Sequence, residues 1–138
     1  MRYYLDTNIL IFILGNDRDE LNTETLDILE AYSNTFYLSI VVLKELILLY
    51  KERKLGHLKY KTYKDIFDII EGLRYEIIPV TKKHLFAYAE LESVREHKDP
   101  NDHIIIAQSI SDKIPVISSD RKFKLYEKQG LRLVFNKR

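Results

Sequence analysis

The chain of 138 residues contains no cysteine. Disulfide bonds, zinc sites built on thiolates and cysteine nucleophiles are therefore excluded. No apolar run reaches the roughly 18 residues that a membrane-spanning helix needs, so we expect no membrane span. The run Tyr3–Leu5 stops at Asp6 and is too short for a signal peptide. Together these absences favour a cytoplasmic protein.

An excess of either charge is also lacking. The net charge is +1, from 22 basic and 21 acidic residues, so overall charge predicts neither nucleic-acid nor membrane binding. Apolar residues make up 46% of the chain and charged residues 31%, which is typical of a globular protein rather than a disordered one. We expect a single domain over residues 1–138, large enough to fold around its own core.

Strand and helix patterns alternate along the whole chain. The expected strands cover residues 2–6, 36–40, 76–80, 114–118 and 131–135. The expected helices cover residues 8–14, 22–33, 41–54, 59–73, a segment after Thr81, 100–111 and 123–128. This alternation predicts an α/β fold with a small, mostly parallel sheet of about five strands flanked by helices. In the helix after Thr81, the apolar residues Leu85, Tyr88 and Ala89 are expected to face the core.

Four acidic residues stand where such a sheet would bring them to one edge. Asp6 and Asp120 directly follow expected strands, Glu45 interrupts an apolar helix, and Asp102 lies in the first turn of its helix. Two carboxylates about 4 Å apart repel by roughly 1 kcal/mol in water and roughly 4 kcal/mol at an effective dielectric constant near 20. A gathered set of four is therefore interpreted first as a site for a hard metal ion.

Each acid also has a purely structural interpretation. Asp6 and Asp120 can cap the helices that follow them, and Asp102 can favour the dipole of its helix. Glu45 can reach solvent beside Lys44. These alternatives stay open for single residues, but the joint pattern is harder to explain without a site.

Asp99 and the four histidines are assigned other roles. Asp99 precedes Pro100 and is assigned mainly to capping the helix. The histidines show no metal-ligand spacing and are expected at the surface, with His103 close enough to Asp102 to reach a substrate; they are His57, His84, His97 and His103.

The ordered motifs resemble those of the PIN domain family, most closely its VapC-type ribonuclease toxins. The four matching segments are Asp6-Thr7-Asn8-Ile9, Ser39 with Glu45, Asp99-Pro100-Asn101-Asp102, and Ser118-Ser119-Asp120 followed by Phe123. Each motif is weak alone, and four in this order are strong. Asn101 replaces a common aromatic residue, His103 a common arginine and Ser118 a more usual threonine, so no acid is lost.

The resemblance implies a PIN-like three-layer fold and a metal-dependent endoribonuclease that uses one or two Mg²⁺ or Mn²⁺ ions. In this interpretation Asp6 and Asp102 bind metal directly, and Glu45 and Asp120 bind through water or hold a second ion. Three further residues would position water or phosphate, or orient the carboxylates: Thr7, Asn8 and Ser118. The metal activates water and offsets charge on the leaving oxygen of the phosphodiester.

The resemblance also implies partners, namely an RNA substrate and a small antitoxin protein. Arg121, Lys122 and Lys124 follow Asp120 and are expected to contact RNA, and the lysine- and tyrosine-rich segment 51–64 is a second basic patch. The helix over residues 41–50 is apolar on several faces. Formation of a homodimer or complete burial within the monomer would account for those faces.

Three alternatives remain to be weighed. A PIN nuclease of RNA processing would need no antitoxin, and a non-catalytic PIN-like module would only bind RNA or protein. A phosphatase of the haloacid-dehalogenase type also begins with a strand that ends in aspartate. Such phosphatases need a second aspartate two residues later, where this chain has Asn8, so they are disfavoured.

Overall fold

The computed structural model describes all residues, 1–138, and has five strands and eight helical segments. The strands are β1 (Arg2–Leu5), β2 (Thr35–Ser39), β3 (Glu76–Ile78), β4 (Val116–Ser118) and β5 (Leu133–Phe135). The helices are α1 (Thr7–Leu14), α2 (Thr23–Glu30), α3 (Ile40–Lys51), α4 (Tyr63–Gly72), α5 (Lys82–Glu90) and α6 (Pro100–Asp112), with 3₁₀ segments η1 (Arg18–Glu20) and η2 (Arg121–Gln129). None of the helices combines the length and the apolar composition needed to cross a membrane.

The five strands form one fully parallel sheet in the order β3-β2-β1-β4-β5. The chain fills one half of the sheet through β3 and then returns to add β4 beside β1. Strand order therefore reverses between β1 and β4, which is where parallel α/β sheets form their ligand-binding crevice. The α/β fold with about five strands that the sequence predicts is confirmed.

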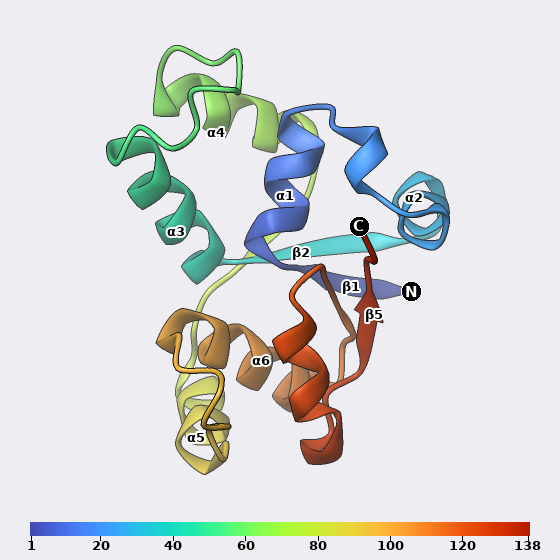
Figure 1. Cartoon of the computed structure of the whole chain (residues 1–138), viewed down its shortest axis with the longest axis vertical. Coiled ribbons are helices and arrows are strands. Elements are labelled where there is room, and N and C mark those ends of the chain that lie inside the picture. Colours follow the sequence, from blue (N-terminus) through green and yellow to red (C-terminus); the bar gives the residue numbers. More distant parts are fainter.

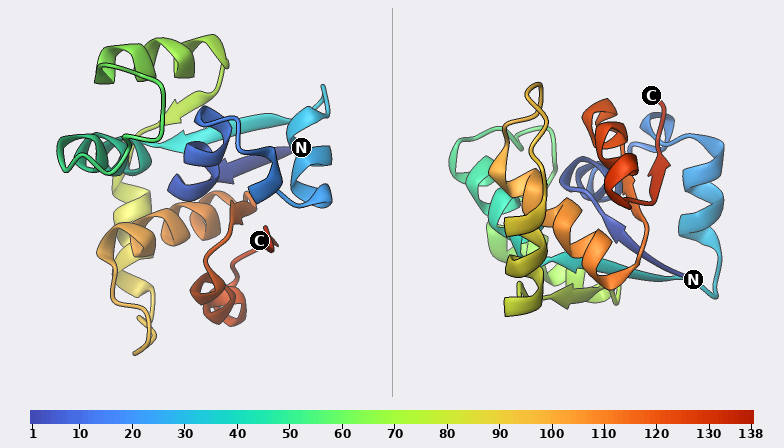
Figure 2. Two further views of the ribbon diagram at one scale, coloured as in Figure 1. Left: turned by 45° about the horizontal axis from the view of Figure 1, so that its top comes forward. Right: turned by 90° about the horizontal axis from the view of Figure 1, so that it is seen from below.

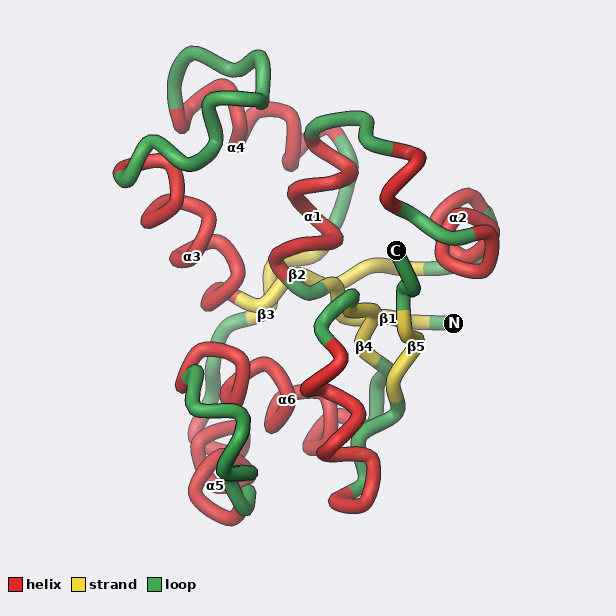
Figure 3. The backbone as a smooth tube through the Cα atoms, viewed as in Figure 1, coloured by secondary structure: helices red, strands yellow, loops and turns green.

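Helices cover both faces of the sheet (Figure 1). Helices α1 to α4 lie on one side, and α5, α6 and η2 on the other, as the further views also show (Figure 2). The strands form the middle layer (Figure 3). The core lies between these layers, and its largest fully buried side chains include Tyr4, Leu5, Leu38, Ile105 and Ile117. Such two-sided cover explains why the strands are apolar runs without clear alternation.

Helix starts gather at the carboxyl edge of the sheet because each strand there ends in a capping residue. Asp6 directly follows β1 and caps α1, and Ser39 is the last residue of β2 and caps α3. Asp120 comes two residues after the end of β4 and caps η2. Asp99 caps α6 through a hydrogen bond from the Asn101 amide, as expected from the following proline. Four helix N-termini therefore present their partial positive charge near this edge.

The burial of one helix and the end of another differ from the sequence expectation. In α5 the side chains of Leu85 and Phe86 are 50% and 64% exposed, and His84 is the buried residue instead. Helix α2 ends at Glu30, and Tyr32 beyond it is fully exposed. Apolar periodicity was misleading in α5 because this helix packs on α6 through a polar contact.

That polar contact joins three elements behind the sheet. Asp112, at the end of α6, accepts a hydrogen bond of 2.6 Å from the Tyr4 hydroxyl of β1. The His84 Nε2 atom lies 2.9 Å from the same carboxylate, while its Nδ1 accepts from the Thr81 amide at 3.0 Å. Since Nδ1 accepts, Nε2 carries the proton and donates to Asp112.

The last residues of the chain are fixed by Asn136, which is fully buried. Its Nδ2 donates to the Glu20 carbonyl at 2.8 Å and lies 2.7 Å from the Ser119 hydroxyl. Its Oδ1 accepts from the Asn22 amide at 2.7 Å. The C-terminal segment thus links η1 and α2 to the turn that precedes Asp120.

Replacing Asp112 with alanine should lower the free energy of unfolding by about 2 kcal/mol, because two buried donors, from Tyr4 and His84, lose their shared acceptor. Urea denaturation would measure the change. The control is Asp27→Ala on the exposed side of α2, expected within about 0.5 kcal/mol of wild type. Equal effects of the two substitutions would contradict a stabilising role for the contact.

Candidate metal centre

The structure brings the four acids of the sequence hypothesis to one edge of the sheet. Asp6 follows β1, Glu45 stands in the second turn of α3, Asp102 lies in the first turn of α6, and Asp120 follows β4. One oxygen each from Glu45, Asp99 and Asp102 lies within 4.8 Å of the other two. A nitrogen of His97 and oxygens of Asp102 and Asp120 form a second set within the same limit. Asp102 belongs to both sets and therefore stands at the centre of the cluster.

Asp6 is the most buried of the acids, with 4% of its surface exposed. Burial first, and then the negative charge of Asp102 and Glu45, raise the pKa of Asp6 to about 7. Burial first, and then Asp99, Glu45 and Asp120, raise the pKa of Asp102 to about 7. The pKa of Glu45 is also raised, chiefly by burial. These mutual effects indicate that the carboxylates lie close enough to interact.

Hydroxyl groups orient two of the carboxylates. The Thr7 hydroxyl donates to Glu45 Oε2 at 2.5 Å, which ties the start of α1 to α3. The Ser118 hydroxyl donates to Asp6 Oδ2 at 2.7 Å and accepts from the Asp120 amide at 3.0 Å. Ser118 thereby links Asp6 and Asp120 across the point where strand order reverses. Asn8, by contrast, is exposed, and its side chain makes no hydrogen bond to the acids.

Capping engages only part of the acids' hydrogen-bonding capacity. Asp6 Oδ1 accepts from the Thr7 amide at 2.8 Å, and Asp120 Oδ1 accepts from the Lys122 amide at 2.9 Å. The Asp99 carboxylate accepts from the Asn101 amide, as expected for a cap. Each oxygen has two lone pairs, so the cluster keeps acceptor capacity for another ligand.

No lysine or arginine forms an ion pair with any of the four acids. Carboxylates that are held together, partly buried and unpaired with a cationic side chain fit a bound cation. The donors are carboxylate and hydroxyl oxygens, which suit Mg²⁺ or Mn²⁺ better than soft metals. The residues present therefore fit a hard divalent ion.

The prediction that the histidines lie at the surface is wrong for three of the four, since only His57 is exposed. His97 is 2% exposed, and its Nε2 lies 2.9 Å from Asp102 Oδ2. Burial lowers the pKa of His97 below its ordinary value. His103 contacts the His97 carbonyl at 2.8 Å rather than facing a substrate. Sequence reasoning missed His97 because its partners come from two other segments and share no regular spacing with it.

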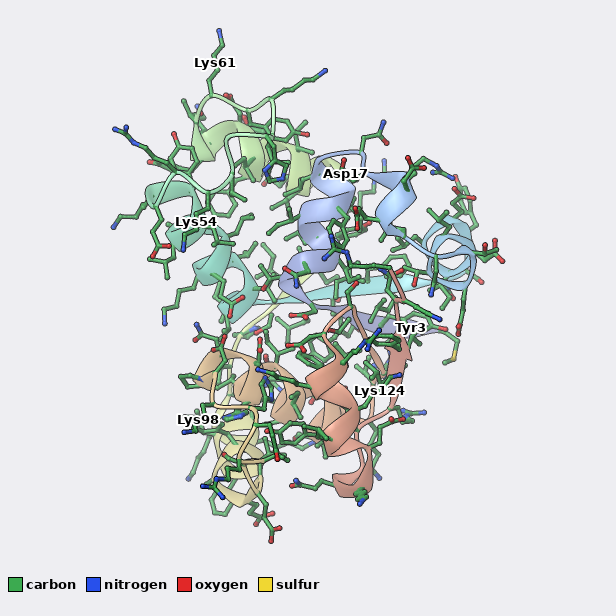
Figure 4. All side chains as sticks on the ribbon, viewed as in Figure 1. Tyr3, Asp17, Lys54, Lys61, Lys98 and Lys124 are labelled. Carbon is green, nitrogen blue, oxygen red and sulfur yellow. The ribbon has the colours of Figure 1, made fainter.

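The basic residues after Asp120 differ in their exposure and in the contacts that their side chains make. Arg121 and Lys122 are exposed, and the charge of Lys122 lowers the pKa of Asp102, so Lys122 lies near the cluster. The ammonium of Lys124 sits 4.1 Å from the centre of the Phe135 ring. In Figure 4, Lys54 and Lys61 lie at the far ends of α3 and α4, well away from Lys124. Of the basic residues, Lys122 is the one best placed for a negatively charged substrate.

Comparison with known proteins supports this assignment of the fold. The family model of the PIN domain matches residues 3–129. A chain in the crystal structure of VapBC2 from Rickettsia felis, bound to a DNA fragment from their promoter, is 28% identical with a TM-score of 0.72. That alignment covers 99% of this chain and 100% of the other. A search of curated proteins finds no match.

Two more distant solved structures show the same fold. One is DNA-bound VapBC from Salmonella typhimurium, with 22% identity, a TM-score of 0.69 and 98% of each chain covered. The other is VapBC-5 from Mycobacterium tuberculosis, a member of the VapBC family of toxin-antitoxin systems. It has 22% identity and a TM-score of 0.57, with 97% of this chain and 98% of the other covered.

The raised pKa values predict how metal-free stability depends on pH. The folded protein keeps a proton on Asp6 up to a pH of about 7, whereas the unfolded chain releases it near its ordinary pKa of about 4. Ionisation of Asp6 therefore lowers the free energy of unfolding as the pH rises through this window. In EDTA, wild type should lose stability relative to Asp6→Asn between about pH 4 and about pH 7, with no further loss from this group at higher pH.

Urea denaturation across this pH range measures the difference. Asp27→Asn serves as the control and should follow wild type at every pH, because Asp27 is exposed and lies on α2. If the free energies of unfolding of wild type and Asp6→Asn changed with pH in parallel, the Asp6 carboxylate would not be destabilised by burial.

Proposed function

The chain belongs to the PIN domain family, and we propose that it is a metal-dependent endoribonuclease, the toxin of a type II toxin–antitoxin pair. We further propose that residues 1–138 form one catalytic domain that acts in the cytoplasm. The observation that carries the proposal is the cluster of unneutralised carboxylates from Asp6, Glu45, Asp102 and Asp120 at the carboxyl edge. The toxin assignment is supported by the similarity to chains in VapBC structures.

The proposed roles follow from burial and contacts. Asp6 and Asp102 would bind the divalent ion directly, because their ionised forms are the most disfavoured without one. Glu45 and Asp120, which are less buried, would bind it through water or hold a second ion. Thr7 and Ser118 would keep two carboxylates in the orientation that binding requires.

A bound Mg²⁺ or Mn²⁺ would supply the chemistry of phosphodiester hydrolysis, by lowering the pKa of water and offsetting charge on the leaving oxygen. The chain's own residues position the reactants. The carboxylates of Glu45 and Asp120 can accept a proton from a water aimed at the phosphorus. Hydrolysis would then leave a 5′-phosphate and a 3′-hydroxyl.

Substrate binding is assigned to the basic residues next to Asp120. Arg121 and Lys122 would contact the RNA backbone, and Lys124 would do so only by leaving the Phe135 ring. The segment 51–64 begins where helix α3 ends, six residues beyond Glu45, which is a rise of about 9 Å at 1.5 Å per residue. Contacts there would involve RNA beyond the scissile bond.

An antitoxin and a second copy of the chain are the proposed protein partners. The similar structures are of VapBC and of a member of the VapBC family of toxin-antitoxin systems, which supports an antitoxin partner. Complete burial of α3 within the monomer is wrong, since Ile40, Ile47 and Leu48 are at least 37% exposed. These side chains leave α3 with apolar surface that a homodimer could bury.

Of the alternatives, a PIN nuclease of RNA processing would use the same centre without an antitoxin. A binding-only module is disfavoured because mutually repelling, buried carboxylates lower stability and would have no function there.

Purified protein should cleave a mixed pool of structured RNAs with Mg²⁺ or Mn²⁺, and EDTA should abolish the cuts. Asp102→Asn should reduce cleavage at least about 100-fold, because the residue shared by both ligand sets loses its charge. Gel analysis of the products with end mapping measures this, with Asp27→Asn as the active control. Retained, metal-dependent cleavage by Asp102→Asn would exclude the proposed centre.

Charge reversal tests the assigned RNA contacts. In the Asp102→Asn background, where RNA stays intact, Lys122→Glu should weaken binding and reduce the salt slope by about 1. Lys124→Glu should do less, because its ammonium already lies on Phe135. Filter binding across a salt series would report both, with Lys83→Glu, exposed on α5 and outside both basic segments, as control. An effect of Lys122→Glu no larger than that of the control would count against the assignment.

A further inference from the structure

His97 lies in the segment between α5 and α6, where it is enclosed by aromatic rings. Its ring centre lies 4.9 Å from that of His103, 5.4 Å from Tyr126 and 5.9 Å from Phe123. In the structure it is the residue that hydrogen-bonds the Asp102 carboxylate, at 2.9 Å. The role of this buried ring beside the central acid of the cluster depends on which of its nitrogens carries a proton.

The hydrogen-bond donors around Tyr126 determine which nitrogen of His97 carries the proton. The Val94 amide donates to the Tyr126 oxygen at 3.2 Å. His103 Nε2 lies 2.8 Å from the His97 carbonyl, which can only accept, so His103 Nε2 carries a proton. That same nitrogen is 3.1 Å from the Tyr126 oxygen and so offers it no lone pair. Of the contacts to Tyr126, only His97 Nδ1, at 3.1 Å, can accept the hydroxyl proton.

The consequence is one tautomer of His97. Because Nδ1 accepts from Tyr126, the neutral ring must carry its hydrogen on Nε2, which faces Asp102 Oδ2. A ring in this state donates to Asp102 and has no lone pair for a metal ion on that side. The proximity of His97, Asp102 and Asp120 within 4.8 Å thus reflects a donor beside two acids, and not a third ligand.

We propose that His97 is a positioning residue for Asp102, held by Tyr126 as the Nε2–H tautomer so that it donates to Asp102 Oδ2 and fixes the carboxylate. The proposal rests on the proposed function, in which Asp102 binds the divalent ion. It adds a third orienting donor to the hydroxyls of Thr7 and Ser118, which hold Glu45 and Asp6.

The segment that carries His97 is itself held by η2. The Gln129 amide group donates to the Glu92 carbonyl at 2.8 Å and accepts from the Glu92 amide at 2.9 Å. Together with the Tyr126 contact to Val94, these bonds attach one end of the segment to η2. The element that begins at Asp120 therefore also positions the donor to Asp102.

Nitrogen-15 NMR of metal-free protein tests the tautomer directly. Wild type should show His97 protonated on Nε2 and unprotonated on Nδ1. Tyr126→Phe keeps the ring but removes the donor to Nδ1, so the fraction of the Nε2–H form should fall, although the Asp102 carboxylate still favours that form. An Nδ1–H form in wild type, or an unchanged tautomer in Tyr126→Phe, would overturn the proposal.

Calorimetric titration with Mn²⁺ tests the consequence for Asp102. His97→Leu should weaken Mn²⁺ binding about 10- to 100-fold, the range found when orienting partners of ligands are removed. His97→Gln keeps an N–H group at the position of Nε2 and should bind within a few-fold of wild type. Exposed His57→Leu is the matched control. Equal binding by His97→Leu and His97→Gln would reject a positioning role.

Two further outcomes distinguish failure of the His97 proposal from failure of the metal-centre proposal. If His97→Leu does not fold, Tyr126→Phe replaces it, and unchanged Mn²⁺ affinity in that variant would argue against the proposal. If wild type binds no Mn²⁺, the proposed metal centre fails, while the NMR measurement still decides whether Tyr126 holds the tautomer.

Discussion

Repulsion among the carboxylates at the carboxyl edge is the constraint to which the surrounding structure responds. Asp6 and Asp102 are buried enough that their ionised forms are disfavoured, and no lysine or arginine pairs with them. The fold offsets part of this cost with hydroxyl donors and with helix N-termini that face the edge. Such local support orients the acids but does not neutralise them, which leaves a divalent ion as the natural complement.

The elements that position the acids were predictable because their signals are local. Apolar runs bounded by polar residues identified the strands, and alternation with helices implied parallel pairing, which placed Asp6 and Asp120 at the same edge of the sheet. Helix α5 was misjudged because its buried contact is polar: His84 faces Asp112, while Leu85 and Phe86 face solvent. Periodicity of apolar residues cannot detect such a contact.

The role of His97 could not be predicted from the sequence for a different reason. Which ring nitrogen of His97 carries the proton depends on Tyr126, which is 29 positions away. It also depends on the contact between His103 and the backbone carbonyl of His97. Only folding brings these groups together. Segment η2 has the same property, because one short element starts at an acid of the cluster and holds the donor to another. A substitution that shifts η2 would therefore displace Asp102 as well as Asp120.

The hydrogen bond between Ser118 and Asp6 joins residues 112 positions apart. Strand β4, which carries Ser118, pairs with β1, and Asn136 closes the structure from the last residues of the chain. Strand β1 thus has one neighbour, β2, that lies close to it in sequence and another, β4, that lies far along the chain. Contacts between distant segments form slowly, because a long loop must close before they can be made. The pairing of β1 with β4, and with it the contact between Ser118 and Asp6, should therefore be a late event in folding.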